Sequence, residues 1–250
     1  MSMRKMNDSE AETAEEWYVQ DRRRRVEEIR RQARRLYGHS SLQADIGSPD
    51  AEAVARKMLG VAASAFWNAE DTELEESVHR DMDSYGKWVR TTFGCHLAYE
   101  SGVYHQRCPV AIAHKRIGMS IGFVASKRIC SICADDWADC PHSPNELYEV
   151  NGGVNPQGYC QVCGTRDCTK HHPDQTYRTP PIAIVTDIER LNEVSLVSKP
   201  AQPDARLTSI PLSTEELRAA LGSLFLPGDM VNCNRCLSPC EGIEEVRLPS

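Results

Sequence analysis

The sequence predicts an α+β protein, in which an N-terminal helical arm precedes a small, mostly antiparallel β domain with zinc-knuckle insertions. Apolar residues recur at helical spacing up to about residue 90. From residue 91 the chain changes to short, partly alternating segments bounded by Gly, Pro or polar clusters. Cysteine and histidine concentrate between residues 130 and 172. We therefore divide the chain into a helical region (1–90), a β domain (91–210) with a zinc-binding insertion at about 127–175, and a C-terminal region (211–250).

Composition narrows the class of protein. The 250 residues carry a net charge of −7 and eleven cysteines. The N-terminus is polar and acidic, without an apolar segment of signal-peptide or membrane-span length, which predicts a reducing intracellular compartment, no disulfides and no membrane partner. The net negative charge disfavours wholesale wrapping of nucleic acid and leaves room for a local basic patch.

Three helices are expected in the first ninety residues. The first runs from about Glu10 to Tyr37, the second is capped by Ser48 with Pro49 at its first position, and the third runs from about Thr72 to Trp88. Each has one apolar stripe, and the third helix is acidic. The polar face of the first helix is rich in arginine: Arg22, Arg23, Arg24, Arg25, Arg30, Arg31, Arg34 and Arg35. This face either docks against the acidic third helix of the same or a neighbouring subunit, or contacts a nucleic-acid backbone.

The β domain is expected to contain short strands and one further helix. The segments that read as extended are 88–97, 103–105, 117–125, 182–187 and 193–198. Near the C-terminus, Ser213 and Glu216 form a capping box, and Leu212 with Leu217 forms a hydrophobic staple. We expect this helix to end at Gly222.

Two ligand sets of three cysteines and one histidine follow one another in the insertion. The first is Cys130, Cys133, Cys140 and His142; the second is Cys160, Cys163 and Cys168 with His171 or His172. A two-residue gap lets both thiolates of a tight turn reach one ion, and this ligand set favours Zn²⁺ over Mg²⁺ or Ca²⁺. The spacing predicts two closed, structural zinc sites.

A third metal is expected at the C-terminus, where Cys233, Cys236 and Cys240 supply three thiolates. Cys95, Cys108 or His105 from the body of the domain would complete the site and pin the C-terminus back. An iron–sulfur cluster is a weaker interpretation, because the group lacks a recognisable cluster spacing.

Two stretches resemble the prohead (capsid maturation) proteases of tailed bacteriophages. Gly118–Phe123 (GMSIGF) is similar to the strand around that family's catalytic serine. Leu191–Val197 and Lys199–Arg206 are similar to its later strand and turn, with Gln202 in place of an Asn. The resemblance implies a compact, mostly antiparallel β-barrel with flanking helices, in which the two strands are neighbours. The zinc-binding segment would then be an insertion between them.

The same resemblance places Ser120 at the nucleophile position and Glu193 at the acidic position. A serine nucleophile needs a histidine base. His79, His96 and His105 are the candidates, and none lies in a context that matches the family's pattern. We therefore expect a protein that is not an active protease.

The sequence thus favours a zinc-stabilised structural or assembly protein of a tailed bacteriophage or prophage, in its head, neck or tail. Its partners would be other subunits of the particle, as a homo-oligomer, in the host cytoplasm during assembly and then in the virion. One alternative is an active serine endopeptidase of capsid maturation. Another is a zinc-knuckle nucleic-acid-binding protein that uses the arginine helix, although the knuckle segment is rich in acidic residues.

Overall fold

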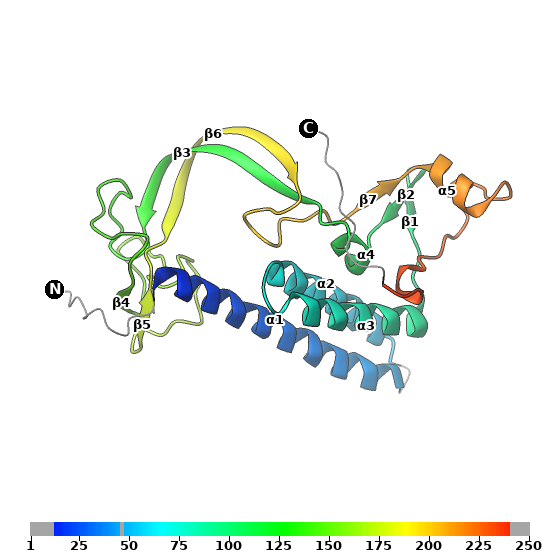
Figure 1. Ribbon diagram of the computed structural model, residues 1–250, viewed down its shortest axis with the longest axis horizontal. Coiled ribbons are helices and arrows are strands. Elements are labelled where there is room, and N and C mark those ends of the chain that lie inside the picture. The colour runs from blue at the N-terminus through cyan, green and yellow to red at the C-terminus, as the bar shows by residue number, and fades with distance from the viewer. Residues whose placement is uncertain (1–12, 46–47, 241–250) are drawn as a thin grey trace. The chain divides into compact units, whose positions relative to one another are not determined.

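The computed structural model describes residues 13–45 and 48–240, and it has the expected α+β composition, with a helical N-terminal region and small antiparallel sheets (Figure 1). The helices are α1 (Ala14–Asp45), α2 (Ala51–Ala69), α3 (Glu75–Phe93), α4 (Pro109–Ala113) and α5 (Thr214–Leu221), with a 3₁₀ turn at Arg235–Leu237. The strands are β1 (Ala98–Glu100), β2 (Val103–Gln106), β3 (Gly118–Cys130), β4 (Tyr148–Asn151), β5 (Thr176–Thr179), β6 (Ala183–Val197) and β7 (Ile210–Leu212).

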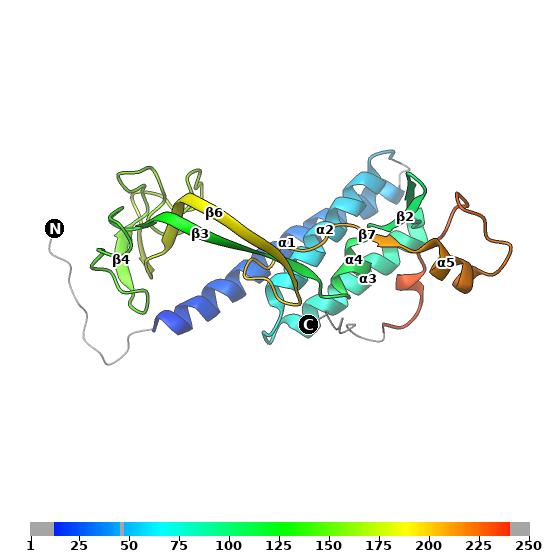
Figure 2. The same ribbon diagram turned by 90° about the horizontal axis from the view of Figure 1, so that it is seen from above.

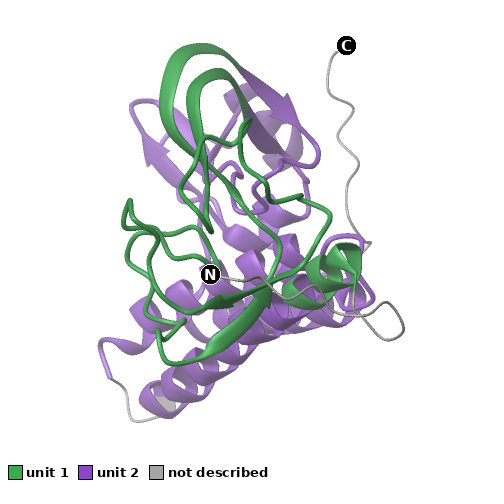
Figure 3. Cartoon of the chain, turned by 90° about the vertical axis from the view of Figure 1, so that its left-hand side faces the viewer, with its two compact units in different colours: residues 1–21, 121–193 green, residues 22–120, 194–250 purple. Residues whose placement is uncertain are grey.

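The chain separates into two compact units that are interleaved in sequence (Figure 3). Unit 1 comprises residues 1–21 and 121–193, and unit 2 comprises residues 22–120 and 194–250. Unit 1 therefore contains the cysteine-rich segment 130–172, and unit 2 contains most of the helical region.

The core of unit 2 is made by the apolar stripes of its helices. Met58 and Phe66 on α2, Val78 and Met82 on α3, and Val26 on α1 are all fully or almost fully buried in one cluster. These positions follow helical spacing, so the three helices expected in this region are confirmed. The expected cap of the second helix is wrong: α2 begins at Ala51 after Asp50, because residues 48–50 form a turn in which Ala51 N–H donates to Ser48 O at 3.2 Å.

The arginine face of α1 docks against acidic residues at and before α3. Arg30 Nε lies 2.6 Å from Asp81 Oδ2, Arg34 Nη2 lies 3.3 Å from the same oxygen, and Arg23 Nη1 lies 3.4 Å from Glu73 Oε1. Of the two alternatives for this face, these contacts match docking within one subunit. They also occupy charges that a phosphate contact would need.

The expectation of an extended segment at residues 88–97 is wrong for its first part, because Trp88–Phe93 is the last part of α3. The apolar stripe continues at helical spacing to buried Val89. The helix ends at Gly94, which has a φ of 75° and donates its N–H to Arg90 O at 3.1 Å. A glycine is suited to that conformation, since it has no Cβ.

β3 and β6 form one two-stranded sheet, as the resemblance to the proteases implies, and they run side by side in both views (Figures 1 and 2). The segments expected as two strands, 182–187 and 193–198, form the single strand β6. The predicted barrel is not confirmed. The sheets that the structure describes have three strands (β1-β2-β7) or two (β3-β6 and β4-β5), and none of them closes on itself.

The C-terminal helix forms as expected. Ser213 Oγ accepts hydrogen bonds from the N–H groups of Glu215 and Glu216, and α5 is followed by Gly222 at its C-terminal end. Leu212 and Leu217, the residues of the expected staple, are both partly buried against the cluster of Tyr104, Phe225 and Val231.

Among the described residues, every helix is too short or too polar to cross a membrane.

Candidate metal centres

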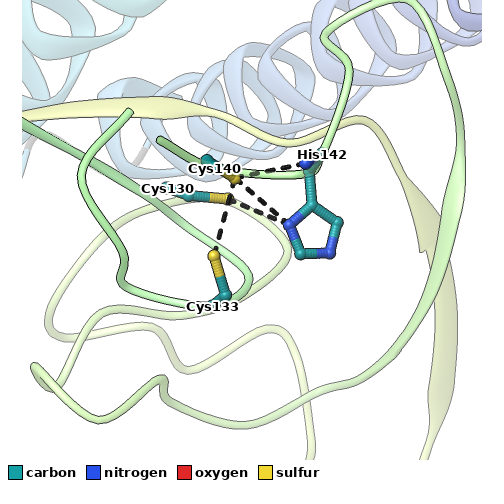
Figure 4. A group of neighbouring side chains, drawn as sticks. All are labelled: Cys130, Cys133, Cys140 and His142. Atoms are coloured by element: carbon teal, nitrogen blue, oxygen red, sulfur yellow. Dashed lines mark hydrogen bonds between the residues drawn. The ribbon is translucent and has the colours of Figure 1, made fainter. Parts of the chain in front are cut away.

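The first cluster brings together the four predicted ligands Cys130, Cys133, Cys140 and His142 (Figure 4). His142 Nδ1 lies 3.3 Å from Cys140 Sγ and 3.8 Å from Cys130 Sγ, and Cys133 Sγ lies 3.5 Å from Cys140 Sγ. All four ligand atoms lie within 4.8 Å of one another. Two thiolates bound to zinc at about 2.3 Å are ~3.8 Å apart in a tetrahedron. The group therefore fits an ion of this size at its centre.

A tight turn directs the first two thiols to the same side. Cys130 N–H donates to Asp135 O at 2.9 Å, and Ala134 N–H donates back to Cys130 O at 2.9 Å. Ala134 closes the turn with a φ of 66°, in the left-handed region. An alanine is strained there by roughly 1–2 kcal/mol.

The second cluster repeats this construction thirty residues later. Cys160 N–H donates to Thr165 O at 2.8 Å, and Gly164 N–H donates to Cys160 O at 2.9 Å. Gly164 has a φ of 69°, in the place that Ala134 takes in the first turn. With Cys163 and Cys168 the ligand atoms again lie within 4.8 Å of one another. The two knuckles are thus one motif used twice.

The structure decides between the two histidines of the second set. His171 Nδ1 lies 3.2 Å from Cys168 Sγ and 3.5 Å from Cys160 Sγ. His172 is not in the group; its backbone N–H donates to Tyr177 Oη at 3.2 Å. His171 is therefore the fourth candidate ligand.

Each ligand histidine has a tyrosine against its ring. The centroids of His142 and Tyr148 are 4.7 Å apart at 81°, and those of His171 and Tyr177 are 4.9 Å apart at 84°. In both knuckles the residue after the histidine donates its N–H to that tyrosine's hydroxyl, with Ser143 taking this role in the first at 2.9 Å. Such contacts orient a ligand ring. Sequence reasoning found the ligands but missed the tyrosines, although each follows its histidine by six residues.

The chemistry of the donors fits a soft divalent cation. Burial raises the pKa of the Cys133 thiol to about 12 and that of Cys160 to about 11, so neither would ionise at neutral pH without a positive charge beside it. Burial also lowers the pKa of His142, which favours the neutral ring that ligates metal. Three thiolates and an imidazole are ligands that suit zinc, and four protein ligands would fill a tetrahedral site.

The ligand cysteines also belong to the apolar interior of unit 1. Its buried apolar cluster consists of Cys130, Ile132, Val150, Cys160 and Val162, with further ligand cysteines and the two tyrosines packed around it. The two knuckles are joined by Gln161, whose Nε2 donates to Ile132 O at 2.9 Å. This cluster has three buried aliphatic side chains, which is a small core, so bound metal would supply folding energy that packing does not.

The C-terminal cysteines are arranged differently from the expectation. Cys95, Cys233 and Cys236 are buried in the core of unit 2, with Cys108 packed against them. Cys233 N–H donates to Cys95 O at 2.8 Å, so a backbone hydrogen bond ties the C-terminal segment to the body of the unit at this point, where the expectation was a shared metal. Cys240 lies elsewhere, with two histidines. His105, the other expected candidate, instead places Nδ1 3.2 Å from Ser209 Oγ.

The group that contains Cys240 is the third cluster of metal-ligating side chains in the described part of the chain. Its other members are His79 on α3 and His114, which follows α4. Sequence reasoning missed the pairing because neither histidine lies in a recognisable ligand spacing, and both are brought together only by the packing of the helices.

The predicted protease residues do not form a catalytic site in the described residues. His79 contacts His114 and Cys240, His105 contacts Ser209, and the backbone of His96 bridges to Asn232. No hydrogen bond joins Ser120 to a histidine in that part of the chain. Glu193 lies beside Gly122 on the neighbouring strand, where a Cβ on that glycine would stand 3.1 Å from Glu193 Cγ.

Comparison of the chain with protein-family models, with curated proteins and with solved structures found no match.

Proposed function

We propose that this protein is a zinc-stabilised structural component that acts through contacts with other protein subunits. The observation that carries the proposal is the repeated Cys₃His cluster, in which four protein ligands surround each candidate ion. Zinc in such a closed site holds a fold together and does not activate water or substrate. The insertion between β3 and β6 is thus a rigid module rather than a catalytic one.

The β3-β6 sheet offers a surface for assembly. Ile121 and Phe123 lie on the same face of β3 and are 56% and 41% exposed. Side chains of Ser126 and Asp187 meet on the other face, so Ile188, which is 47% exposed, shares the face of Ile121 and Phe123. Exposed apolar side chains that gather on one face are typical of an interaction surface.

We propose that a second copy of the chain pairs with the open edge of β3 and so continues this face. In the two-stranded sheet each strand has one unpaired edge, and residues 121–126 of β3 contain no charged side chain or proline to discourage pairing. The same uncharged segment on another copy can align with it antiparallel, which gives a symmetric homo-oligomer.

The particular assembly that we propose is a tailed bacteriophage or prophage particle. The resemblance of Gly118–Phe123 and Leu191–Arg206 to prohead proteases motivates it, and the pairing of β3 with β6 supports it. An active serine endopeptidase of capsid maturation is the second candidate, and the histidine contacts described above speak against it.

Light scattering on the full chain tests the assembly proposal. Wild-type protein should form a defined oligomer, and Phe123→Lys should shift it to monomer because a charge at the edge opposes pairing. Val154→Lys is the matched control, because Val154 is an exposed apolar residue of unit 1 outside the sheet. A wild-type monomer at all concentrations contradicts the proposal, as does Ser120-dependent cleavage of a scaffold-type substrate.

A further inference from the structure

Three ligand atoms meet in unit 2, outside the two knuckles. His79 Nε2 and His114 Nε2 are 3.0 Å apart, His114 Nε2 lies 3.1 Å from Cys240 Sγ, and Cys240 Sγ lies 3.5 Å from His79 Nε2. Two nitrogens and a sulfur at these separations have the spacing of three corners of a tetrahedral zinc site.

A hydrogen bond at Nδ1 of His114 determines which nitrogen of that ring carries the proton. Nδ1 lies 2.6 Å from Val110 O, and since a carbonyl only accepts, Nδ1 carries the proton. In the neutral ring Nε2 therefore presents a lone pair to His79 and Cys240. A backbone carbonyl on the outer nitrogen is the arrangement that orients metal-ligating histidines.

Burial makes this lone pair costly to leave without a partner. The His114 side chain is 1% exposed, whereas Cys240 is exposed, so the group can meet solvent on the side of Cys240 and not through His114. His79 is held by α3 and packs against Phe66, with ring centroids 5.5 Å apart. Both rings are thus positioned by the helical core, and Cys240 completes the triangle from the C-terminal segment.

We propose that His79, His114 and Cys240 hold a third zinc ion, whose fourth position is open to water or a small anion. Two imidazoles and one thiolate suit zinc. In the described residues, no further Cys, His, Asp or Glu side chain joins the group, in contrast to the four ligands of each knuckle. This ion would bind an external ligand, which the closed knuckle sites cannot.

Metal analysis of the full-length protein tests the site. After saturation with zinc and desalting, Cys240→Ser combined with His79→Gln should contain about one equivalent less zinc than wild type. Cys240 is exposed and His79 is half-buried, so these changes spare the core better than a change at His114. The single variant Cys240→Ser, checked by circular dichroism, separates loss of a ligand from loss of fold.

A matched variant distinguishes this inference from the proposed function. Cys133→Ser should remove one equivalent from unit 1 and leave the third site intact. If the zinc content per chain falls in Cys133→Ser but not in the double variant, the third site is contradicted and the proposed function is not. If the zinc content falls in neither variant, both the third site and the proposed zinc-stabilised function are contradicted.

Cobalt tests the open position. In Co²⁺-substituted protein, the visible absorption bands of the third site are those that the double variant lacks. Azide should change these bands and leave the bands of the two knuckle sites unchanged. If the bands of the third site do not change with azide, the site is closed, and the proposed open fourth coordination position is contradicted.

Discussion

The ring of Tyr148 meets the ring of His142 edge to face, with centroids 4.7 Å apart, and Tyr177 repeats this contact with His171. The tyrosines are therefore part of the knuckle motif. Each fixes the orientation of one ligand ring and also binds the backbone that follows it.

Tyr148→Ala should weaken zinc binding by about 10- to 100-fold, because the His142 ring loses the contact that orients it. Tyr148→Phe keeps the ring and loses only the hydroxyl, so it should retain zinc and lower the free energy of unfolding by about 0.5–1.5 kcal/mol. Competition titration with a chromophoric chelator measures the affinity. Equal affinities for the two variants would show that the ring plays no orienting role.

His171→Gln should cost the protein about one equivalent of zinc, whereas His172→Gln should leave the zinc content unchanged. The two positions are adjacent, and only the Nδ1 of His171 reaches the cysteine sulfurs. Elemental analysis of the two purified variants gives the answer. The opposite pattern would mean that the ring of His172 is the ligand.

Ala134→Gly and Gly164→Ala, at the equivalent turn positions of the two knuckles, should change the stability of unit 1 in opposite directions. Ala134→Gly relieves a left-handed alanine and should stabilise unit 1 by about 1 kcal/mol. Gly164→Ala introduces the same strain, with its Cβ only 3.3 Å from Ile184 Cγ1, and should destabilise by at least as much. Thermal melts of zinc-loaded protein make the comparison, and shifts of the same sign would contradict it.

Knuckle ligands and helices could be predicted from the sequence because each leaves a local pattern, whereas the pairing of β3 with β6 was expected only from the resemblance of two stretches to the proteases. Cys130 and Cys133 show their role by spacing alone. The group at His79, His114 and Cys240 leaves none, since residues from three separate segments meet there only after the helices pack. The barrel is not confirmed for a related reason: a resemblance over two strands does not specify how further strands pair.

Arg206→Met should destabilise unit 2 by about 3–5 kcal/mol, because it leaves a buried carboxylate without its main partner. Arg206 is 4% exposed, and its Nη2 lies 2.5 Å from Oε2 of the buried Glu70. Lys199→Met is the control: Lys199 pairs with Asp71 at the surface, where such pairs contribute about 0–1 kcal/mol. Urea unfolding that shows similar losses for both variants would contradict the buried-pair argument.

The zinc content of protein purified without added metal tests the central claim most directly. We expect at least two equivalents per chain, and removal of the metal by a chelator should abolish the protection of residues 131–182 from proteolysis while the helices of unit 2 persist. Less than about two equivalents, or an insertion that stays protected after the metal is removed, would contradict the account.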